Sequence, residues 1–241
     1  MDDHDGGGVM PGVPESKRES PSSARASYDL FAEHYDDWPW QIFWRKNEWP
    51  HVRALVASCD RRGSLLDVGT GTGFYLGELR SCVGCGCGVD VSYGMLRKAR
   101  QRIGQEALLI QADATSLPLK AALFDIVLLN RVASHIEDLD ALGSELERVL
   151  SDRGRLIVSD VAPEHDYCHT ELGSKHGRIF VETYKHTMES WLRFGRRHGL
   201  AVIFQRTISA RNVDWLPADG FSSIDRSGVR PVGFILAFER A

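Results

Sequence analysis

The residues of this chain whose chemistry is easiest to interpret are an aspartate and three glycines at alternate positions after it. They lie in the stretch Leu65-Leu66-Asp67-Val68-Gly69-Thr70-Gly71-Thr72-Gly73. The apolar run before the glycines predicts a buried strand, and Phe74-Tyr75-Leu76 after them predicts the start of a helix. The glycines therefore form a strand-to-helix turn, where the backbone bends tightly and a ligand can approach closely.

Turns of this kind bind two classes of ligand, dinucleotides and S-adenosylmethionine, and the spacing helps to separate them. A dinucleotide site uses Gly-x-Gly-x-x-Gly so that a pyrophosphate can lie on the helix N-terminus. Here the third glycine comes one residue early, and Asp67 stands two residues before the first. A carboxylate repels a pyrophosphate but attracts the ammonium group of a methionine moiety. The turn therefore favours S-adenosylmethionine.

Polar residues also end the next three apolar runs, at Asp90, Asp113 and Asn130. In open α/β sheets an acid at the end of the second strand is where a ribose is usually bound, so Asp90 fits both ligand classes. Asp113 is suited to accept a hydrogen bond from an exocyclic amine, which an adenine carries. All these residues follow strands, so a parallel sheet would bring them to one edge.

Three motifs together resemble those of the class I S-adenosylmethionine-dependent methyltransferases, above all the enzymes similar to ubiquinone and menaquinone C-methyltransferases. The motifs are Asp67-x-Gly-x-Gly-x-Gly73, Asp90-Val91-Ser92-x-Gly94-Met95-Leu96 and Ala112-Asp113-Ala114. The resemblance covers roughly residues 24–241 and is closest over 65–161. It implies a Rossmann-like methyltransferase fold: a doubly wound α/β sheet of seven mostly parallel strands, whose last strand is antiparallel, under an N-terminal helical lid.

The resemblance also implies S-adenosylmethionine as the cofactor and S-adenosylhomocysteine as the product, and it assigns the residues that bind them. The glycines would shape the loop under the methionine moiety, Asp90 would bind the ribose, Met95 and Asp113 the adenine, and Asn130 would lie beside the sulfonium. The cofactor residues implied are Tyr28, Tyr35, Asp67, Gly69, Thr70, Gly71, Gly73, Asp90, Val91, Met95, Asp113, Ala114, Asn130 and Arg131. Packing in the hydrophobic core would also explain a methionine at position 95.

The segment Tyr28-Asp29-x-x-Ala32-x-x-Tyr35-Asp36 resembles the N-terminal helix that closes over the cofactor in these enzymes. Tyr28 and Tyr35 are seven residues apart and would lie on one face of a single helix. An amphipathic helix docked on the sheet would explain the same spacing. The aromatic residues from Trp38 to Trp49 indicate either an acceptor pocket or plain core.

A general base is needed only if the methyl acceptor carries a proton. Histidine titrates near neutrality, and our candidates, in order of preference, are His165, His169 and His135. The first two lie in a polar segment, 162–185, that we expect to be an irregular active-site loop, where solvated histidines are also common. No third ligand accompanies His165 and His169, and Cys85 and Cys87 fit a strand, so we expect no metal.

Composition and charge exclude several classes of protein. The 241 residues carry a formal net charge of −4, which gives no reason to expect nucleic acid or an anionic membrane as partner. No apolar run approaches the ~20 residues that span a bilayer, and the acidic N-terminus lacks the pattern of a secretory signal. We expect a cytoplasmic monomer or homodimer that acts on a small molecule.

Composition and alternating patterns divide the chain into four parts. We expect a disordered tail over 1–23, a helical lid over 24–60, a cofactor-binding half over 61–161, and a substrate loop with the C-terminal strands over 162–241. Strands are expected at 64–68, 84–89, 107–111, 124–129, 154–160, 200–207 and 231–240. Helices are expected at 28–36, 50–58, 73–81, 92–103, 138–150 and 187–198, with Ser92 and Thr187 as N-caps.

The predicted function is methyl transfer from S-adenosylmethionine to oxygen or nitrogen of a small molecule, in the biosynthesis of a natural product. Three alternatives remain open: a C-methyltransferase of a quinone-like or aromatic substrate, a nicotinamide-dependent oxidoreductase, and a non-catalytic protein that binds S-adenosylmethionine. Methyl transfer depends chiefly on proximity and a dry pocket, so the sequence defines the methyl donor better than the acceptor.

Overall fold

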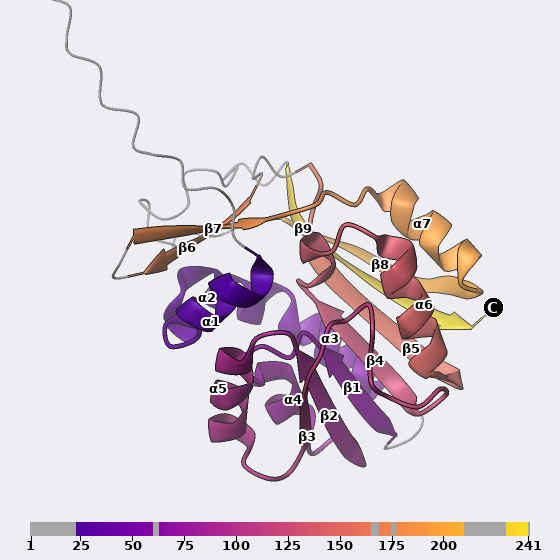
Figure 1. The fold of residues 1–241 in the computed structure, drawn as a ribbon. Helices are drawn as coiled ribbons and strands as arrows, with labels where there is room; N and C mark the ends of the chain where they lie inside the picture. Colours follow the sequence, from indigo (N-terminus) through magenta and orange to yellow (C-terminus); the bar gives the residue numbers. More distant parts are fainter. Residues whose placement is uncertain (1–22, 60–62, 165–168, 175–176, 210–229, 241) are drawn as a thin grey trace, which may run out of the picture.

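A seven-stranded sheet forms the centre of the molecule in the computed structural model, which describes residues 23–59, 63–164, 169–174, 177–209 and 230–240 (Figure 1). The strand order is β3-β2-β1-β4-β5-β9-β8, in which β9 runs antiparallel to both of its neighbours and the other pairs are parallel. The strands are β1 (Ser64–Val68), β2 (Cys85–Asp90), β3 (Leu108–Gln111), β4 (Phe124–Asn130), β5 (Leu150–Val161), β8 (Leu200–Ser209) and β9 (Pro231–Arg240). The predicted fold class is therefore confirmed. The predicted disordered tail lies outside the described residues except for Ser23.

Helices cover both faces of the sheet, because alternate residues of the central strands point to opposite sides. Leu65 and Leu128 pack in one apolar core with the helices that precede β1 and with α4 (Phe74–Leu79). Leu66 and Leu129 pack in a second core with α6 (Leu139–Val149) and α7 (Met188–Arg197). Because β1 to β5 run parallel, the loops that follow them lie at one edge of the sheet.

Local signals set the helix boundaries in the cofactor-binding half and beyond. Ser92 accepts the Met95 amide at the start of α5 (Tyr93–Ile103), and Thr187 accepts the Ser190 amide at the start of α7, as predicted. Gly199 follows α7 with a φ of +62°, a conformation that favours glycine. The strand predictions are confirmed to within a few residues.

The N-terminal segment differs from the single helix predicted over 28–36. It forms α1 (Ala24–Phe31), a 3₁₀ turn (Tyr35–Asp37) and α2 (Pro39–Asn47), whereas the helix predicted over 50–58 is confirmed as α3 (Trp49–Ala57). Pro39 and Pro50 each occupy the first turn of a helix, where the missing amide hydrogen is tolerated, so the tryptophan-rich stretch is helical. Phe43 and Trp44 are buried in the first core, which makes α2 part of the sheet's packing.

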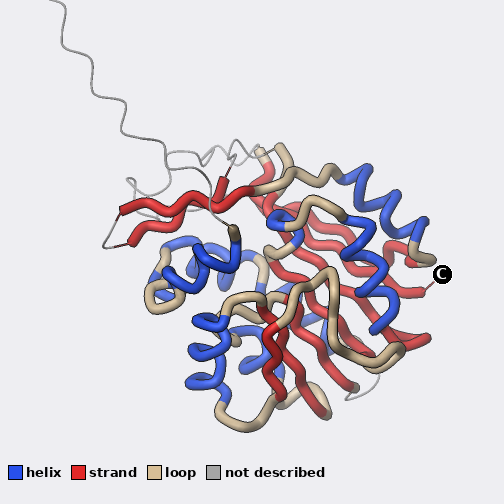
Figure 2. The backbone as a smooth tube through the Cα atoms, in the orientation of Figure 1, coloured by secondary structure: helices blue, strands red, loops and turns tan. Residues whose placement is uncertain are grey.

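The expectation of an irregular loop over 162–185 was wrong. Strands β6 (His169–Ser174) and β7 (Gly177–Glu182) pair antiparallel as a separate two-stranded sheet, which Figures 1 and 2 show beside α1. Val181 is buried against Phe31 of α1, and this contact gives the hairpin an apolar partner. The polar composition of the segment hid the pattern, because its partner is a helix distant in sequence.

Candidate functional site

The glycine turn after β1 is tied to the end of β2. The amides of Gly69 and Thr70 donate to the Val89 carbonyl at 2.7 and 2.9 Å, and the Gly71 amide donates to Asp90 Oδ2 at 2.8 Å. Gly69 has a φ of +69°, and a Cβ atom there would lie 2.1 Å from the Val132 side chain. The turn therefore needs glycine both for its backbone conformation and for close packing against the segment after β4.

Two buried carboxylates flank this turn. Asp67 accepts the Thr70 hydroxyl at 2.8 Å, and Asp90 accepts the Ser92 amide at 2.9 Å. Burial raises the pKa of Asp67 to about 7 and the pKa of Asp90 to about 6, because a charged carboxylate loses its hydration there. A ligand that brings a positive charge or hydrogen-bond donors to them would stabilise both carboxylates. An ammonium group and a pair of ribose hydroxyls are donors of that kind.

The residues predicted to bind adenine lie near the ends of β2 and β3. Met95 is buried in the first turn of α5, and the Val91 carbonyl accepts the Gln111 side chain at 3.0 Å. Asp113 is exposed, and its Oδ1 accepts the amide and the hydroxyl of Thr115 at 2.8 and 2.7 Å. Asp113 is thus held in place by its own turn, together with the neighbouring Ala114.

The end of β4 carries a buried polar cluster that sequence reasoning missed. We call the side chains of Glu48, Tyr75, Arg131 and Ser159 the Glu48 cluster. The Glu48 carboxylate is fully buried and contacts the Arg131 guanidinium, the Tyr75 hydroxyl and the Ser159 hydroxyl. Burial, together with Glu48, holds the pKa of Tyr75 well above its usual value. No sequence signal marks Glu48, which reads as an ordinary surface residue between two helices.

Arg131 follows Asn130 directly and adopts a φ of +58°, which is unusual for a residue with a side chain. Its guanidinium lies over the rings of Trp44 and Tyr75, 5.3 and 5.4 Å from their centroids. These contacts direct Arg131 away from β4 towards the N-terminal helices. The strained backbone and the ion pair with Glu48 therefore occur together at the edge of the sheet where the glycine turn lies.

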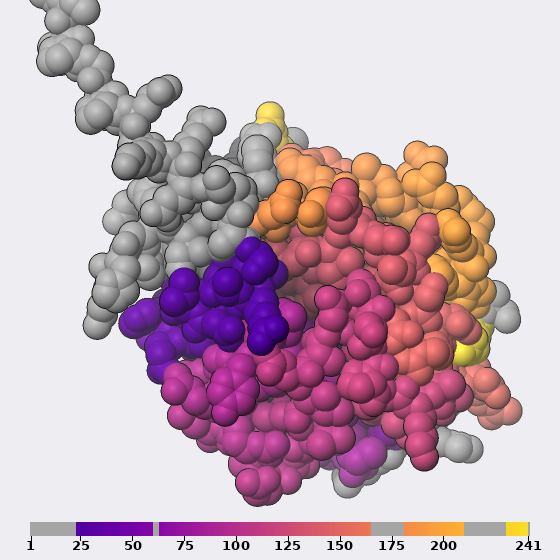
Figure 3. Space-filling model, in the orientation of Figure 1, coloured from indigo at the N-terminus to yellow at the C-terminus, as the bar shows by residue number. Residues whose placement is uncertain are grey.

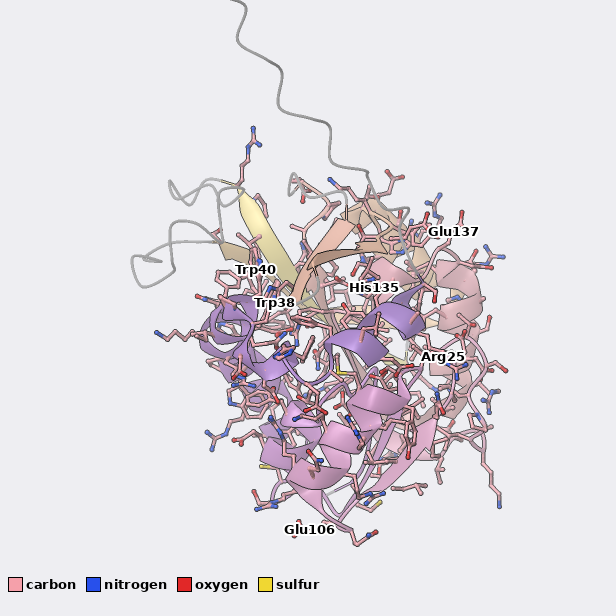
Figure 4. The ribbon with its side chains drawn as sticks, turned by 60° about the vertical axis from the view of Figure 1, so that its left-hand side comes forward. Arg25, Trp38, Trp40, Glu106, His135 and Glu137 are labelled. Carbon is pink, nitrogen blue, oxygen red and sulfur yellow. The ribbon has the colours of Figure 1, made fainter. Side chains whose placement is uncertain are left out.

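Both tyrosines of the N-terminal segment reach the site, although they do not share one helix. Their rings are 6.0 Å apart in an edge-on contact. A methyl group built on Gly71 would meet the Tyr35 ring at 3.8 Å, so Tyr35 lies over the glycine turn. The Tyr28 hydroxyl lies 2.9 Å from His135 Nε2. Figure 4 shows His135 beside α1.

The Glu182 carbonyl determines which ring nitrogen of His135 carries the hydrogen. It lies 3.3 Å from Nδ1 and can only accept, so Nδ1 carries the hydrogen and Nε2 accepts from Tyr28. Burial lowers the pKa of His135, and Asp160 opposes this in part. Nε2 is therefore an unprotonated acceptor at neutral pH.

A second contact fastens α1 to the start of α5. Asp29 Oδ1 accepts the Ser92 hydroxyl at 2.6 Å and the Gly94 amide at 2.8 Å. A carboxylate is favourable at this position because it complements the positive end of the helix dipole. In Figure 3 the indigo surface of the N-terminal helices lies directly against the magenta surface of the cofactor-binding half. α1 thus covers the edge of the sheet that carries the candidate site.

The three predicted bases are not equally visible in the structure. His165 lies outside the described residues, and of His169 the structure describes the backbone, which opens β6 opposite Glu182. His186, which lies between β7 and α7, has Nε2 at 3.1 and 2.8 Å from the Ala133 and Ile136 carbonyls, and these contacts indicate a structural role. His135 is the candidate whose side chain the structure places at the site.

Comparisons with known proteins show which proteins this chain is similar to. Residues 66–158 match a family model described as a methyltransferase domain. A malonyl-[acyl-carrier protein] O-methyltransferase of Geobacter sulfurreducens is 38% identical over 95 residues, which cover 37% of this chain and 35% of that protein. A demethylmenaquinone methyltransferase of Roseiflexus castenholzii is 32% identical over 117 residues, which cover 47% of this chain and 49% of that protein.

Solved structures show the same fold. The putative methyltransferase in complex with the Haloferax volcanii Trm112 methyltransferase activator matches with a TM-score of 0.71 and 21% identity, over 91% of this chain and 97% of that one. The chain spans 22% to 49% of the length of the first curated relatives it matches. Residues 66–158, which match the methyltransferase family model, contain the glycine turn, both buried carboxylates and His135.

Proposed function

Since the chain carries a class I S-adenosylmethionine-dependent methyltransferase domain, we propose that it transfers a methyl group to an oxygen or nitrogen atom of a small molecule. The observation that carries the proposal is the convergence of the glycine turn and Asp90, joined by the hydrogen bond from the Gly71 amide. Asp90 fits both ligand classes, but Asp67 argues against the nicotinamide alternative, because its buried carboxylate lies beside the turn where a pyrophosphate would lie.

The residues at the site fit the cofactor. Asp90 offers carboxylate oxygens to ribose hydroxyls, and Asp67 lies at the turn where the ammonium group of the methionine moiety would be stabilised. Tyr35 lies over the glycine turn, where its ring would cover the methionine moiety. S-adenosylmethionine supplies an activated methyl group, so the protein has to position the acceptor and, where necessary, remove its proton.

We assign proton removal to the pair Tyr28 and His135. Because Nε2 of His135 accepts from the Tyr28 hydroxyl, a proton leaving the acceptor passes to the Tyr28 oxygen while the Tyr28 proton moves to Nε2. The lowered pKa of His135 keeps Nε2 ready to accept it at neutral pH. His165 and His169 remain the candidates for this role if His135 does not fill it.

We propose the class of methyl acceptor from the names of the similar proteins. A malonyl-[acyl-carrier protein] O-methyltransferase among the relatives supports an oxygen acceptor. A demethylmenaquinone methyltransferase supports the alternative, a quinone-like substrate methylated on carbon. The predicted setting is natural-product biosynthesis by a cytoplasmic monomer or homodimer. Within the described part of the chain, no helix has the length and apolar character needed to cross a membrane.

The test is acceptor-dependent formation of S-adenosylhomocysteine, measured by mass spectrometry with the full-length protein. A panel of phenols, amines, carboxylic acids and quinols separates the acceptor classes. S-adenosylhomocysteine should raise the melting temperature and NADH should not. A ligand that binds the folded state raises the free energy of unfolding by about 2.7 kcal/mol at a hundredfold excess over its dissociation constant. Stabilisation by NADH alone would reject the proposal. Tight cofactor binding without turnover on any acceptor would support the non-catalytic alternative.

A further inference from the structure

The side-chain amide of Asn130 is buried, and within the described part of the chain one of its two polar atoms has no hydrogen-bond partner. Asn130 ends β4, and because Leu129 pairs with Val68, it lies beside Gly69 of the glycine turn. Its Oδ1 is 2.9 Å from the Ser159 hydroxyl, whereas its Nδ2 is buried and has no hydrogen-bond partner among the residues that the structure describes. A buried donor without a partner costs about 1–3 kcal/mol, so this arrangement needs an explanation.

The number of hydrogens available at Ser159 explains the unsatisfied atom of Asn130. Its hydroxyl has a single hydrogen and also contacts Glu48, whose other carboxylate oxygen contacts the Arg131 guanidinium. Glu48 forms an ion pair with the Arg131 guanidinium, and in this pair its carboxylate oxygens act as hydrogen-bond acceptors. The Ser159 hydrogen therefore goes to Glu48, the stronger acceptor because it is charged.

Ser159 is then left with lone pairs facing Asn130, and the atom of Asn130 that meets it must be a donor. The two orientations of an amide have the same outline and are distinguished by their hydrogen bonds. Rotation of the amide by half a turn brings Nδ2 to Ser159 and satisfies it. The atom left without a partner is then Oδ1, an acceptor, at the carboxyl end of β4.

This acceptor lies on the same face of the sheet as Asp67. Leu65 and Leu128 pack in one core, so Asp67 and Asn130, each two residues further along its strand, point to that same side. The two side chains face the region beside the glycine turn with acceptor atoms, and burial already disfavours the charge on Asp67. A cationic donor suits both groups.

We propose that Glu48 and Ser159 are positioning residues that hold the Asn130 side chain with its oxygen towards the cofactor, where it accepts a hydrogen bond from the ammonium group of the methionine moiety. The inference rests on the proposed function, because it requires that cofactor. The inference gives the Glu48 cluster a role: its ion pair with Arg131 determines the orientation of the neutral Asn130 side-chain amide. Arg131 pairs with Glu48, Glu48 accepts the Ser159 hydrogen, and the Ser159 oxygen in turn accepts from the Asn130 amide.

The first test compares Asn130→Leu and Asn130→Asp by calorimetry with two probes. S-adenosylhomocysteine carries the ammonium group, and 5′-methylthioadenosine lacks the whole amino-acid moiety. Asn130→Leu should weaken S-adenosylhomocysteine by about 10- to 100-fold and leave 5′-methylthioadenosine unchanged. Asn130→Asp keeps an acceptor and should bind S-adenosylhomocysteine more tightly than Asn130→Leu does. Weaker binding by Asn130→Asp, or equal losses for both probes, would overturn the proposal.

The second test addresses the positioning residue. Ser159→Ala should weaken S-adenosylhomocysteine by several-fold and spare 5′-methylthioadenosine. Ser151→Ala is the matched control, because Ser151 lies at the other end of β5 and its hydroxyl contacts Asp125. Unchanged affinity in a folded Ser159→Ala protein would contradict the role of Ser159.

A third measurement needs no change at Ser159. In isotope-labelled wild-type protein, the Nδ2 hydrogens of Asn130, identified by their loss in Asn130→Asp, should show nuclear Overhauser contacts to the Ser159 β hydrogens. Their absence would show the opposite amide orientation and overturn the inference. Failure of the wild-type protein to bind S-adenosylhomocysteine would instead reject the proposed function, so the two failures are distinguishable.

Discussion

Tyr28 and His135 are 107 positions apart in the chain, yet the Tyr28 hydroxyl and His135 Nε2 share a hydrogen bond of 2.9 Å. The contact joins α1 to the segment after β4. It thereby links the helix that covers the site to the group that we propose removes the acceptor's proton. The Asp29 contacts fasten the same helix to the start of α5.

If His135 receives the acceptor's proton, His135→Ala should lower turnover by ~10²–10⁴-fold while the affinity for S-adenosylhomocysteine stays the same. Single-turnover kinetics and calorimetry separate the two effects. Tyr28→Phe should lower turnover as well, because it removes the hydroxyl that relays the proton. Turnover within a fewfold of the wild type in both variants would exclude the pair. His165→Ala and His169→Ala would then test the remaining candidates.

Asp90 should bind the ribose. Asp90→Ala should weaken S-adenosylhomocysteine by ~1.5–3 kcal/mol, the range for hydrogen bonds to a charged group. Asp152→Ala is the control, since Asp152 is an exposed carboxylate at the opposite end of the sheet. Calorimetry showing equal affinity for both variants would remove Asp90 from the ribose site.

Asp67 should make the stability of the ligand-free protein depend on pH. Its pKa is about 7 in the folded protein and near 3.8 in a free side chain, so the folded state holds a proton that the unfolded state loses. Stability therefore falls as pH rises from about 4 to about 7, by at most ~1.4 kcal/mol for each unit of pKa shift. Urea unfolding across this range should show a flatter dependence in Asp67→Asn. An identical slope in both proteins would contradict the raised pKa.

Deletion of residues 1–37 removes α1 and the 3₁₀ turn, and with them both tyrosines of the lid. The sheet should remain folded and turnover should be lost, because the cover over the glycine turn and the Tyr28 relay are both absent. Deletion of residues 1–20 is the control and should leave turnover unchanged. A longer deletion through residue 49 would be uninformative, because Phe43 and Trp44 belong to the core. Full turnover without α1 would reject the lid.

Features encoded by neighbouring residues were predictable from the sequence. The run before Gly69 is apolar because β1 is buried on both faces, and the glycine spacing reflects a turn whose positive φ angles are local properties. Ser92 and Thr187 cap helices through residues three positions away, which a sequence pattern records directly. The seven-stranded, mostly parallel sheet with an antiparallel last strand followed from the resemblance that these local motifs carry.

Contacts between distant segments required the tertiary structure. Glu48 reads as a surface residue, and its burial depends on Arg131 and Ser159, which lie 83 and 111 positions away. The β6–β7 hairpin forms against α1, so the local polarity of residues 162–185 misled the prediction. The sequence by itself thus determined the fold class and the methyl donor, because short-range patterns encode strands, caps and the glycine turn. The tertiary structure alone decided that Tyr28 meets His135 and how the buried charges are paired, because those contacts depend on side chains that meet only after folding.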